Sequence, residues 1–534
     1  SDAGHGVGYT GIRIRGVDPT RINVTLNGIP LNDAESQGVF WVNLPDLASS
    51  TSSIQVQRGV GTSTHGAGAF GATINVQTGQ HPEEAQTRIR SAVGAYGTQS
   101  LAGQFATGRS ERGWSAEGRF STIQSDGYID RASSQLFSGY GSLAKQTGRG
   151  VLKLDWMSGR EETYQAWNGV PEPILTGDAA GLERYITGLF IAPNQAERLR
   201  SSLGQRNYNE FTYENQIDHY GQDHLQLHLS HGFDAPWVVN ASLHYTFGKG
   251  YYEEFAAGQS LDDYGLRVAS VDAHAGSEMG QSFSDLTRRR WLKNHFFGGI
   301  VTLDWLGSAT DGSTTDRATT DRATDGSTTD RATSTSSSTS IIPTDSPGAS
   351  GNIELTLGLA AHHYMGDHFG QVLWTQREVV TSLATPHNYY VNDAIKTDAN
   401  TFAKVSWSPV EGWTLFGDLQ FRWVSHTFEG KALRDVLGGT GSGATGSPTE
   451  VINLESTETF TFFNPKAGVT WQPSQRTKFY ASFAVAGKEP SRNDLVNSPA
   501  SNRPSPERLF NTELGLDHQF KAWRMQLNAF WMHY

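Results

Sequence analysis

The chain has 534 residues, with 59 glycines, no cysteine and a formal net charge of −12 at pH 7. The lack of cysteine excludes a disulfide framework, a zinc–thiolate site and a cysteine nucleophile. The acidic balance argues against nucleic acid as a partner, because phosphate binding needs clustered cations. No apolar run reaches about eighteen residues, so the sequence predicts no transmembrane helix. Its mean hydropathy is −0.46, which suits a soluble protein but also a transmembrane β-barrel, whose strands alternate apolar and polar residues.

Residues 12–78 form a series of short strand patterns separated by turns. The runs 22–26, 54–56 and 74–76 alternate β-branched or aliphatic residues with polar ones, which is typical of strands. Asn27-Gly28 and several later glycines mark turns between the runs. The pattern predicts a compact unit of small strands.

Residues 66–71 read G-x-G-x-x-G, the spacing of the dinucleotide-binding fingerprint. That fingerprint requires a strand before it and a helix after it, so that the pyrophosphate meets a helix N-terminus. Here Ser63–His65 precede the glycines and the β-branched run Ala72–Val76 follows them. A strand is therefore expected after the glycines, which argues against a nucleotide site.

Four motifs in this stretch resemble, in the same order, the plug domain of TonB-dependent outer-membrane receptors. They are Arg15-Gly16, Leu26–Leu31, Ile54–Gly59 and Gly66–Val76. Two departures from the family pattern are visible: Asn27 replaces the commoner aspartate, and a single Gly71 stands where a glycine pair is usual. The resemblance implies a plug over residues 1–82, truncated at its N-terminus.

From residue 83 onward the pattern changes to longer amphipathic strands. In the run 413–426, Trp413, Leu415, Leu419, Phe421 and Trp423 fall on one face, and Asp418, Gln420, Arg422 and His426 on the other. Strands of about ten residues with one apolar face fit a tilted bilayer crossing. Aromatic residues near segment ends are expected to form interfacial girdles: Tyr128, Tyr140, Trp237, Tyr251, Tyr252, Trp423, Trp523 and Trp531. Soluble β-sandwiches also alternate, but rarely with strands so long and numerous.

About sixteen such segments occur between residues 83 and 534, against roughly twenty-two in plugged outer-membrane transporters. We therefore expect a fragment that lacks both ends, including C-terminal strands; a closed sixteen-stranded barrel is the alternative. Long connections are expected at 157–209, with a helix near Asn194–Leu203, at 255–290 and at 428–458. Residues 307–350 contain a repeat and a Ser/Thr tract, which predicts a low-complexity external loop.

A second group of motifs lies late in the chain, and it resembles the barrel consensus of the same receptors. It comprises Asn464–Trp471, Phe479–Phe483, Lys488–Arg492, Pro506-Glu507 and Asn511–Leu516. The Lys488–Arg492 variant looks most like iron-complex receptors of Bacteroidetes-type bacteria. The resemblance implies an all-β membrane protein, a transmembrane antiparallel β-barrel with a small α+β plug in its lumen. It also implies the outer membrane of a Gram-negative bacterium and energy from the TonB–ExbB–ExbD complex.

The resemblance also suggests site residues. Ligand contacts in the family come from apical plug loops, which here correspond to the insert after Leu31. The candidate ligand-binding residues in this insert are Asn32, Asp33, Glu35, Gln37 and Trp41. The alternative is that these are loop residues that pack against the barrel wall. Arg15 and Arg58 match plug arginines, and Glu513 matches a barrel glutamate that pairs with them, as a latch. Arginine's planar fork suits such a bidentate pair.

Histidines give a weaker signal. His224 and His228 lie on one strand, where both side chains face the barrel lumen. His362, His363 and His368 stand at an expected strand end, within reach of a haem or metal complex. The segment Pro490–Pro506 contains no histidine, which disfavours a haem receptor. The sequence indicates no catalytic residue, resident metal or cofactor.

These features predict an active importer of a scarce ligand, most readily a ferric siderophore or similar iron complex, embedded in outer-membrane lipid. A receptor for cobalamin, oligosaccharide or peptide is an alternative, because one scaffold serves many ligands. The sequence is also compatible with a passive surface-binding barrel and with a soluble all-β carbohydrate-active protein.

Overall fold

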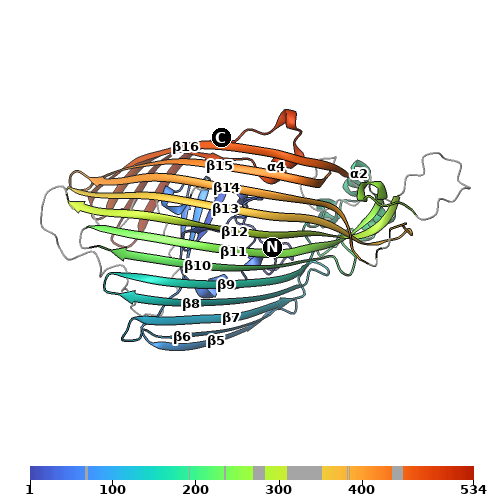
Figure 1. Ribbon diagram of the computed structural model, residues 1–534, viewed down its shortest axis with the longest axis horizontal. Coiled ribbons are helices and arrows are strands. Elements are labelled where there is room, and N and C mark those ends of the chain that lie inside the picture. The colour runs from blue at the N-terminus through green and yellow to red at the C-terminus, as the bar shows by residue number, and fades with distance from the viewer. Residues whose placement is uncertain are drawn as a thin grey trace, which may run out of the picture.

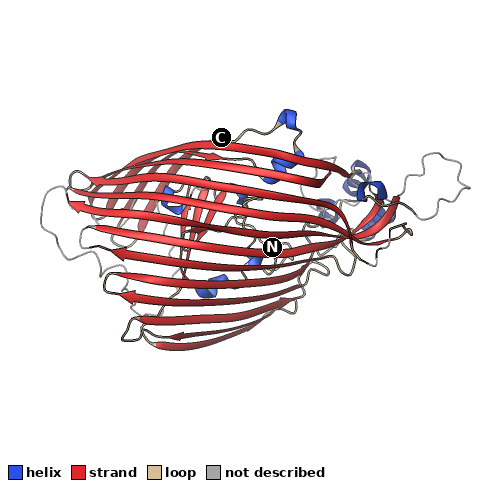
Figure 2. Cartoon of the chain, viewed as in Figure 1, coloured by secondary structure: helices blue, strands red, loops and turns tan. Residues whose placement is uncertain are grey.

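A fifteen-stranded antiparallel sheet curves around a small four-stranded sheet in the computed structural model of this chain (Figure 1). We call the large sheet the wall and residues 1–82 the plug. Figure 2 shows the short plug strands enclosed by the long strands of the wall. The structure describes residues 1–66, 70–189, 191, 193–233, 236–268, 283–308, 351–381, 383, 385–435 and 449–534.

Each wall strand pairs with its neighbours in sequence, so the topology is a simple meander. The strands are β5 (Ala85–Val93), β6 (Gln99–Thr107), β7 (Trp114–Ser125), β8 (Ser134–Thr147), β9 (Gly150–Tyr164), β10 (Ile217–Gly232), β11 (Trp237–Ser260), β12 (Phe283–Ser308), β13 (Asn352–Thr375), β14 (His387–Ser408), β15 (Trp413–Asp435), β16 (Thr449–Ser474), β17 (Thr477–Lys488), β18 (Glu507–Gln519) and β19 (Arg524–His533). Strands β5 and β19 do not pair with each other, so the wall is open along one side.

Strand β15 confirms the alternation read from the sequence. Its apolar row is 38–53% exposed on the outer face: Trp413, Leu415, Leu419, Phe421 and Trp423. Its polar row is at most 5% exposed and faces the lumen: Asp418, Gln420, Arg422 and His426. An outward apolar row and an inward polar row fit a strand with lipid on one side and a filled lumen on the other.

The aromatic girdle differs in part from the expectation. Trp413 and Trp471 stack with ring centroids 5.7 Å apart, and Phe479 continues the row at 5.3 Å, on the outer face near the short turns. Tyr140 and Tyr252, by contrast, face the lumen, where Tyr140 packs against the plug core and Tyr252 contacts Trp167. Position near a strand end did not reveal the side of these two rings, since a shift of one residue reverses the face.

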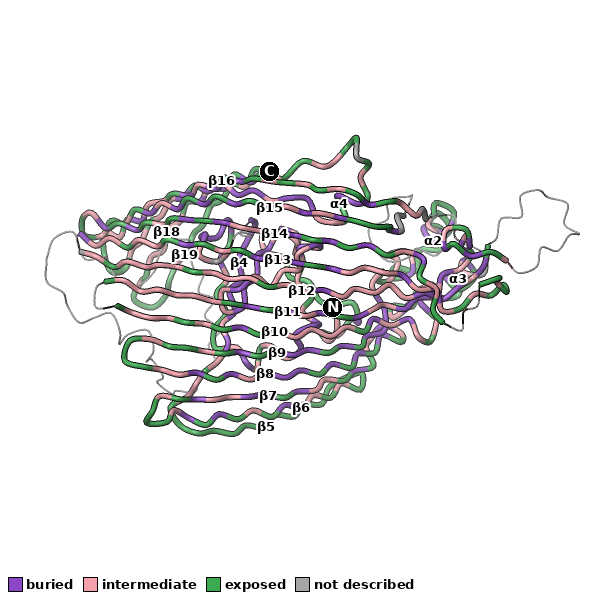
Figure 3. Tube along the Cα trace, in the orientation of Figure 1, coloured by how far each residue is buried: buried purple, intermediate pink, exposed green. Residues whose placement is uncertain are grey.

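The plug sheet has the order β2-β1-β4-β3, with β1 and β4 parallel and the other pairs antiparallel. Its strands are β1 (Ile22–Leu26), β2 (Ile29–Pro30), β3 (Thr51–Arg58) and β4 (Ala72–Thr78). The short helices η1 (Pro19–Arg21), η2 (Trp41–Asn43), η3 (Leu47–Ser50) and η4 (Ser63–His65) connect them. Figure 3 shows β4 buried deep inside the wall. A strand follows the glycine-rich segment, as the sequence predicts; residues 67–69 of that segment lie outside the described residues.

The plug core is built from the alternating side chains of β1 and β4. Ile22, Val24, Leu26, Ile74 and Val76 are at most 5% exposed. They form one apolar cluster that extends to Tyr140 and Met157 of the wall. Burial of this cluster joins the plug to the wall and positions the loops above it.

The long connections that contain helices lie at one end of the wall, and most of the short turns lie at the other. The β9–β10 connection holds α1 (Glu172–Thr176), α2 (Ala179–Gly188) and α3 (Pro193–Ser201), and α3 confirms the predicted helix. The same end carries η5 (Leu261–Tyr264), α4 (Arg492–Asn497) and η6 (Ala500–Asn502). None of the helices in the described ranges is long and apolar enough to cross a bilayer.

The strands that border two expected long connections extend further than the sequence predicts, while residues 269–282 and 436–448 of those connections lie outside the described part of the chain. β11 continues to Ser260 and β12 begins at Phe283, while β15 continues to Asp435 and β16 begins at Thr449. These strand ends carry charged pairs such as Glu254–Arg288, with 2.7 Å between Oε1 and Nε. These polar segments lack the apolar face of a bilayer crossing. The sequence pattern therefore predicted loops at positions where the strands continue.

The low-complexity segment 307–350 connects β12 to β13, and residues 309–350 lie outside the described part of the chain. Its flanks, Ser308 and Asn352, pair with each other at the end that also holds the short β8–β9 and β16–β17 turns. The external position expected for the loop falls on residues outside the described part of the chain, so it stays a prediction.

Candidate functional site

The loop that follows β2, residues 31–41, lies at the top of the plug, and we call it the apex loop. Asn32 holds it to the plug sheet: its Oδ1 accepts from the Val24 backbone N–H at 2.7 Å and its Nδ2 donates to the Ile22 carbonyl at 2.9 Å. Asp33 accepts from the backbone N–H groups of Glu35 and Ser36, at 3.1 and 2.7 Å. Both side chains therefore shape the loop itself.

Glu35 joins the apex loop to the wall. Its carboxylate accepts hydrogen bonds from the Tyr364 hydroxyl at 2.6 Å and from His368 Nε2 at 2.7 Å, both on β13. Arg492, the first residue of α4, lies 3.0 Å away from the other carboxylate oxygen. Burial opposes ionisation of Glu35, but His368, Arg492 and Tyr364 outweigh it and lower the pKa of Glu35 to about 2.

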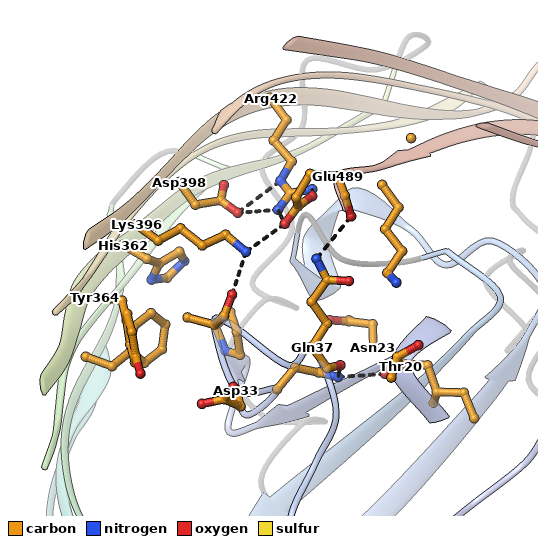
Figure 4. Close-up of a pocket in the computed structure, with 17 residues that line it drawn as sticks. Thr20, Asn23, Asp33, Gln37, His362, Tyr364, Lys396, Asp398, Arg422 and Glu489 are labelled. Carbon is orange, nitrogen blue, oxygen red and sulfur yellow. Dashed lines mark hydrogen bonds and ion pairs between the residues drawn. The ribbon is translucent and has the colours of Figure 1, made fainter. Parts of the chain in front are cut away.

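Gln37 and Ala34 form further contacts with the wall (Figure 4). Gln37 donates to the Glu489 carbonyl at 3.1 Å, and Lys396 Nζ donates to the Ala34 carbonyl at 2.6 Å. Glu489 in turn pairs with Lys396 at 2.8 Å and with Arg422 at 2.7 Å. The apex loop is thus held by a buried ionic network that spans β14, β15 and the end of β17.

A cavity of about 110 Å³ lies between the apex loop and the wall. Asn32, Asp33 and Gln37 line it from the plug, and His362 and Lys396 from the wall (Figure 4). Ligand pockets usually measure about 300–1,000 Å³, whereas a water molecule occupies about 30 Å³. This cavity suits a few waters in the plug–wall seam and is smaller than an ordinary ligand pocket.

Trp41 does not face this cavity. It packs against the apolar cluster of the plug core. Beside it, a Cβ atom on Gly159 of β9 would lie only 1.9 Å from the Asn43 carbonyl oxygen. A side chain at position 159 would therefore prevent the close approach of η2 to the wall, and Trp41 contributes to that packed contact.

The structure brings two of the three proposed latch residues together. Arg15 donates to Glu513 Oε1 at 2.7 Å and to Oε2 at 3.4 Å, and both side chains are at most 8% exposed. The Arg15 guanidinium also lies 3.9 Å from the centre of the Phe530 ring. Gly59 permits this geometry, because a Cβ there would lie 2.2 Å from Glu513 Oε1. Arg58 is exposed and forms no ion pair with Glu513 in the described chain.

A second plug–wall pair was not anticipated from the sequence. Arg21 donates to both carboxylate oxygens of Glu507, at 2.9 and 2.7 Å. The two side chains are 33% and 41% exposed, so solvent screens the pair more than it screens Arg15–Glu513. Glu507 belongs to the Pro506-Glu507 motif, which is the signal that could have indicated it.

Four aromatic rings form a row of contacts between the plug and the wall. Phe40, Tyr9, Trp167 and Tyr252 form a chain of edge-to-face contacts, with centroid distances of 6.4, 5.8 and 5.5 Å. The Arg290 guanidinium lies 5.9 Å from the centre of the Tyr252 ring. We call these five residues the aromatic mouth. The sequence analysis missed it as a unit, because its members come from the plug, one connection and two strands.

Within the described residues, the histidines are not part of any group of three or more side chains arranged to hold a metal. His244 and His362 contact each other through ring nitrogens 2.9 Å apart, and His363 contacts Thr397 at 2.9 Å. His224 contacts the Thr246 hydroxyl at 3.0 Å, and His228 the Ser242 hydroxyl at 2.8 Å. Only His368 contacts the apex loop among the histidines that the sequence analysis named, and it does so through Glu35.

Solved structures show what this fold is similar to. The ferric-catecholate import receptor Fiu from E. coli in its open form matches with a TM-score of 0.63 at 13% identity, covering 98% of this chain and 69% of that one. The siderophore receptor PiuA from Acinetobacter baumannii matches with a TM-score of 0.60 at 11% identity, covering 99% and 67%. The copper transporter OprC matches with a TM-score of 0.60 at 13% identity, covering 96% and 65%. The chain thus spans about two thirds of the length of these proteins.

Family models match both parts of the chain. The TonB-dependent receptor plug domain matches residues 2–73, and the TonB-dependent receptor-like β-barrel matches residues 167–534. No curated protein sequence matches the chain. The two family matches cover β1 to β3 and the first two residues of β4 in the plug, and the wall from β10 to β19. The chain therefore belongs to the TonB-dependent receptors of the Gram-negative outer membrane, as a plug domain within a β-barrel wall.

Proposed function

We propose that this receptor imports a ferric siderophore or similar iron complex across the outer membrane, with energy from the TonB–ExbB–ExbD complex of the inner membrane. The observation that carries the proposal is the aromatic mouth with its arginine, which joins Phe40 of the apex loop to the wall. Flat rings and a guanidinium suit a ligand that is aromatic, anionic or both, and ferric catecholates have this chemistry. Structures with the same fold include a ferric-catecholate import receptor and a siderophore receptor.

The contacts around the mouth suggest how binding reaches the plug. Glu254 pairs closely with Arg288, at 2.7 Å, and lies farther from Arg290, at 3.5 Å. Because Arg288 is the closer partner of Glu254, we propose that the Arg290 guanidinium can also bind an anionic ligand. Tyr9 and Phe40 of the mouth belong to the plug, and Arg492 connects α4 to Glu35. A ligand held by the mouth would therefore touch the plug and the wall together. We propose that this shared contact transmits ligand occupancy to the plug.

The test of the proposed function is growth of the producing bacterium with this receptor as its only importer. Panels of ferric catecholates, other iron chelates and cobalamin are supplied with and without TonB. We expect TonB-dependent rescue by an iron complex. Rescue by cobalamin alone would overturn the iron proposal. Binding of an iron complex without any rescue would instead favour a passive surface receptor.

Replacement of Arg290 by glutamine should weaken binding of the rescuing ligand by about tenfold, since a desolvated cation–ring or ion-pair contact contributes roughly 1–2 kcal/mol. Binding to the purified receptor is measured by quenching of its tryptophan fluorescence. Arg289→Gln is the matched control, because Arg289 is the adjacent residue on the opposite face, where it pairs with Glu253 at 2.7 Å. Equal affinities for the two variants would remove Arg290 from the ligand site.

A further inference from the structure

Two acidic side chains face the lumen near the external end of the wall, on neighbouring strands. Glu161 lies on β9 and Asp218 on β10, and they are 1% and 8% exposed. Asp218 stands directly opposite Thr163 in the β9–β10 register. Glu161 is two residues before Thr163, so it shares the same face of β9. The three oxygen-bearing side chains therefore meet at one place in the lumen.

Their hydrogen-bonding and ionic partners are incomplete. Both carboxylate oxygens of Glu161 and the Thr163 hydroxyl are buried, and in the described chain they form no close hydrogen bond apart from a weak contact with each other. Asp218 accepts a hydrogen bond from the Tyr9 hydroxyl of the plug. Throughout the described ranges, no lysine, arginine or histidine forms an ion pair with Glu161 or Asp218.

Two carboxylates in such a place need a positive partner. Removing a charged group from water costs several kcal/mol unless an opposite charge or a set of hydrogen bonds compensates. The wall supplies neither to Glu161, although elsewhere it pairs its buried acids, as in Glu489 with Lys396 and Arg422. The oxygen atoms of Glu161 and Thr163 that lack a close partner belong to this small cluster, which indicates a bound species that brings positive charge.

The donor atoms narrow the chemistry of that species. Carboxylate and hydroxyl oxygens are hard ligands that suit Ca²⁺ or Mg²⁺ rather than softer transition metals. Two carboxylates match the charge of one divalent ion. Ca²⁺ accepts an irregular shell completed by carbonyls and water, whereas Mg²⁺ needs near-ideal octahedral geometry. The described residues hold no group of three or more His, Asp or Glu arranged for a metal, so water must complete the shell and the affinity is modest.

We propose that Glu161 and Asp218 bind one Ca²⁺ ion in the lumen, with the Thr163 hydroxyl as a further ligand, and that this ion secures the plug segment carrying Tyr9 to the wall. The ion neutralises the pair and holds Asp218 where the Tyr9 hydroxyl reaches it. The expected dissociation constant is about 10⁻⁴ to 10⁻³ M, the range of extracellular calcium modules. This site adjoins the aromatic mouth through Tyr9, but its binding of Ca²⁺ requires no iron ligand.

The protein in detergent micelles, stripped of metal with a chelator, provides the test. Tb³⁺ serves as a luminescent Ca²⁺ analogue, because Tyr9 contacts Asp218 and Trp167 lies 5.8 Å from Tyr9 between ring centroids, close enough to sensitise it. We expect sensitised Tb³⁺ luminescence that decreases when Ca²⁺ displaces Tb³⁺. In equilibrium dialysis, the wild-type protein should bind one Ca²⁺ per chain more than Glu161→Gln or Asp218→Asn. Ca²⁺ should also raise the unfolding temperature of the wild-type protein.

Glu162→Gln is the matched control, since Glu162 is adjacent, exposed and lies 3.4 Å from His219; it should bind Ca²⁺ like the wild type. Thr163→Val keeps both acids and should weaken binding by about tenfold, the effect of losing one ligand of roughly 1.4 kcal/mol. Equal Ca²⁺ stoichiometry in the wild type, Glu161→Gln and Asp218→Asn would overturn the proposal. It would mean that Glu161 and Asp218 share a proton instead of a metal ion. If either acid variant fails to fold, the Thr163→Val titration decides: unchanged Ca²⁺ affinity would overturn the proposal.

Discussion

Glu513→Ala in the receptor should loosen the plug within its wall. Glu513 and Arg15 have side chains at most 8% exposed, and Arg15 approaches both carboxylate oxygens. Removing one partner of a buried pair leaves the other charge without compensation, at a cost of about 3–5 kcal/mol. We expect faster amide hydrogen exchange in β3 and β4 of the plug, and entry of antibiotics that the intact outer membrane excludes.

The Arg21–Glu507 pair supplies the matched control for this prediction. Glu507 lies on the same strand as Glu513 and also pairs with a plug arginine, but its side chain is 41% exposed. Exposed pairs contribute about 0–1 kcal/mol, so Glu507→Ala should change plug exchange and leakage far less. Exchanging the charges, Arg15→Glu with Glu513→Arg, should restore part of the loss. Unchanged plug exchange and unchanged leakage in Glu513→Ala would show that the pair is no latch.

Features that obey a local rule were predicted best from the sequence. Alternation along residues 413–426 assigned Trp413 and Phe421 to the lipid face and Asp418 and Arg422 to the lumen, and burial confirms each of them. The rule works because side chains in a strand point to opposite faces in turn. Motif order likewise identified the plug and the wall, which the two family matches confirm.

Contacts between distant segments were harder to predict. Arg15 and Arg58 looked equivalent beside their glycines, but only Arg15 reaches Glu513, which is 498 positions away in sequence. The aromatic mouth joins Tyr9, Trp167 and Tyr252, and no local pattern links them. The contacts of Glu35 with the wall were not predicted, because neither Tyr364 nor His368 could be placed opposite it before the fold was known.

Glu35→Gln should detach the apex loop from the wall, and the effect should depend on pH. The ionised carboxylate is held by His368, Arg492 and Tyr364, which lower the pKa of Glu35 from 4.5 to about 2. A shift of this size corresponds to about 3 kcal/mol at neutral pH, since one pKa unit is 1.36 kcal/mol. Amide exchange in residues 31–41 should therefore be about a hundred times faster in Glu35→Gln at pH 7.

The sign of the pH dependence comes from the lowered pKa. Protons bind more readily to the undocked carboxyl, so the stabilisation is complete above about pH 4.5 and is lost as pH falls towards 2. The difference in unfolding temperature between the wild type and Glu35→Gln should accordingly shrink as pH falls below about 4.5. Glu35→Asp keeps the charge but shortens the side chain, so it should lose the contacts with Tyr364 and His368 at every pH.

The same contact makes Glu35 a test of communication between the external connections and the plug. Arg492 begins α4, where a capping box between Ser491 and Asp494 fixes the helix start. Arg492→Gln should reproduce the faster exchange of the apex loop, and the double variant with Glu35→Gln should add little, because the two residues act through one contact. Full additivity of the two effects would mean that α4 and the apex loop move independently.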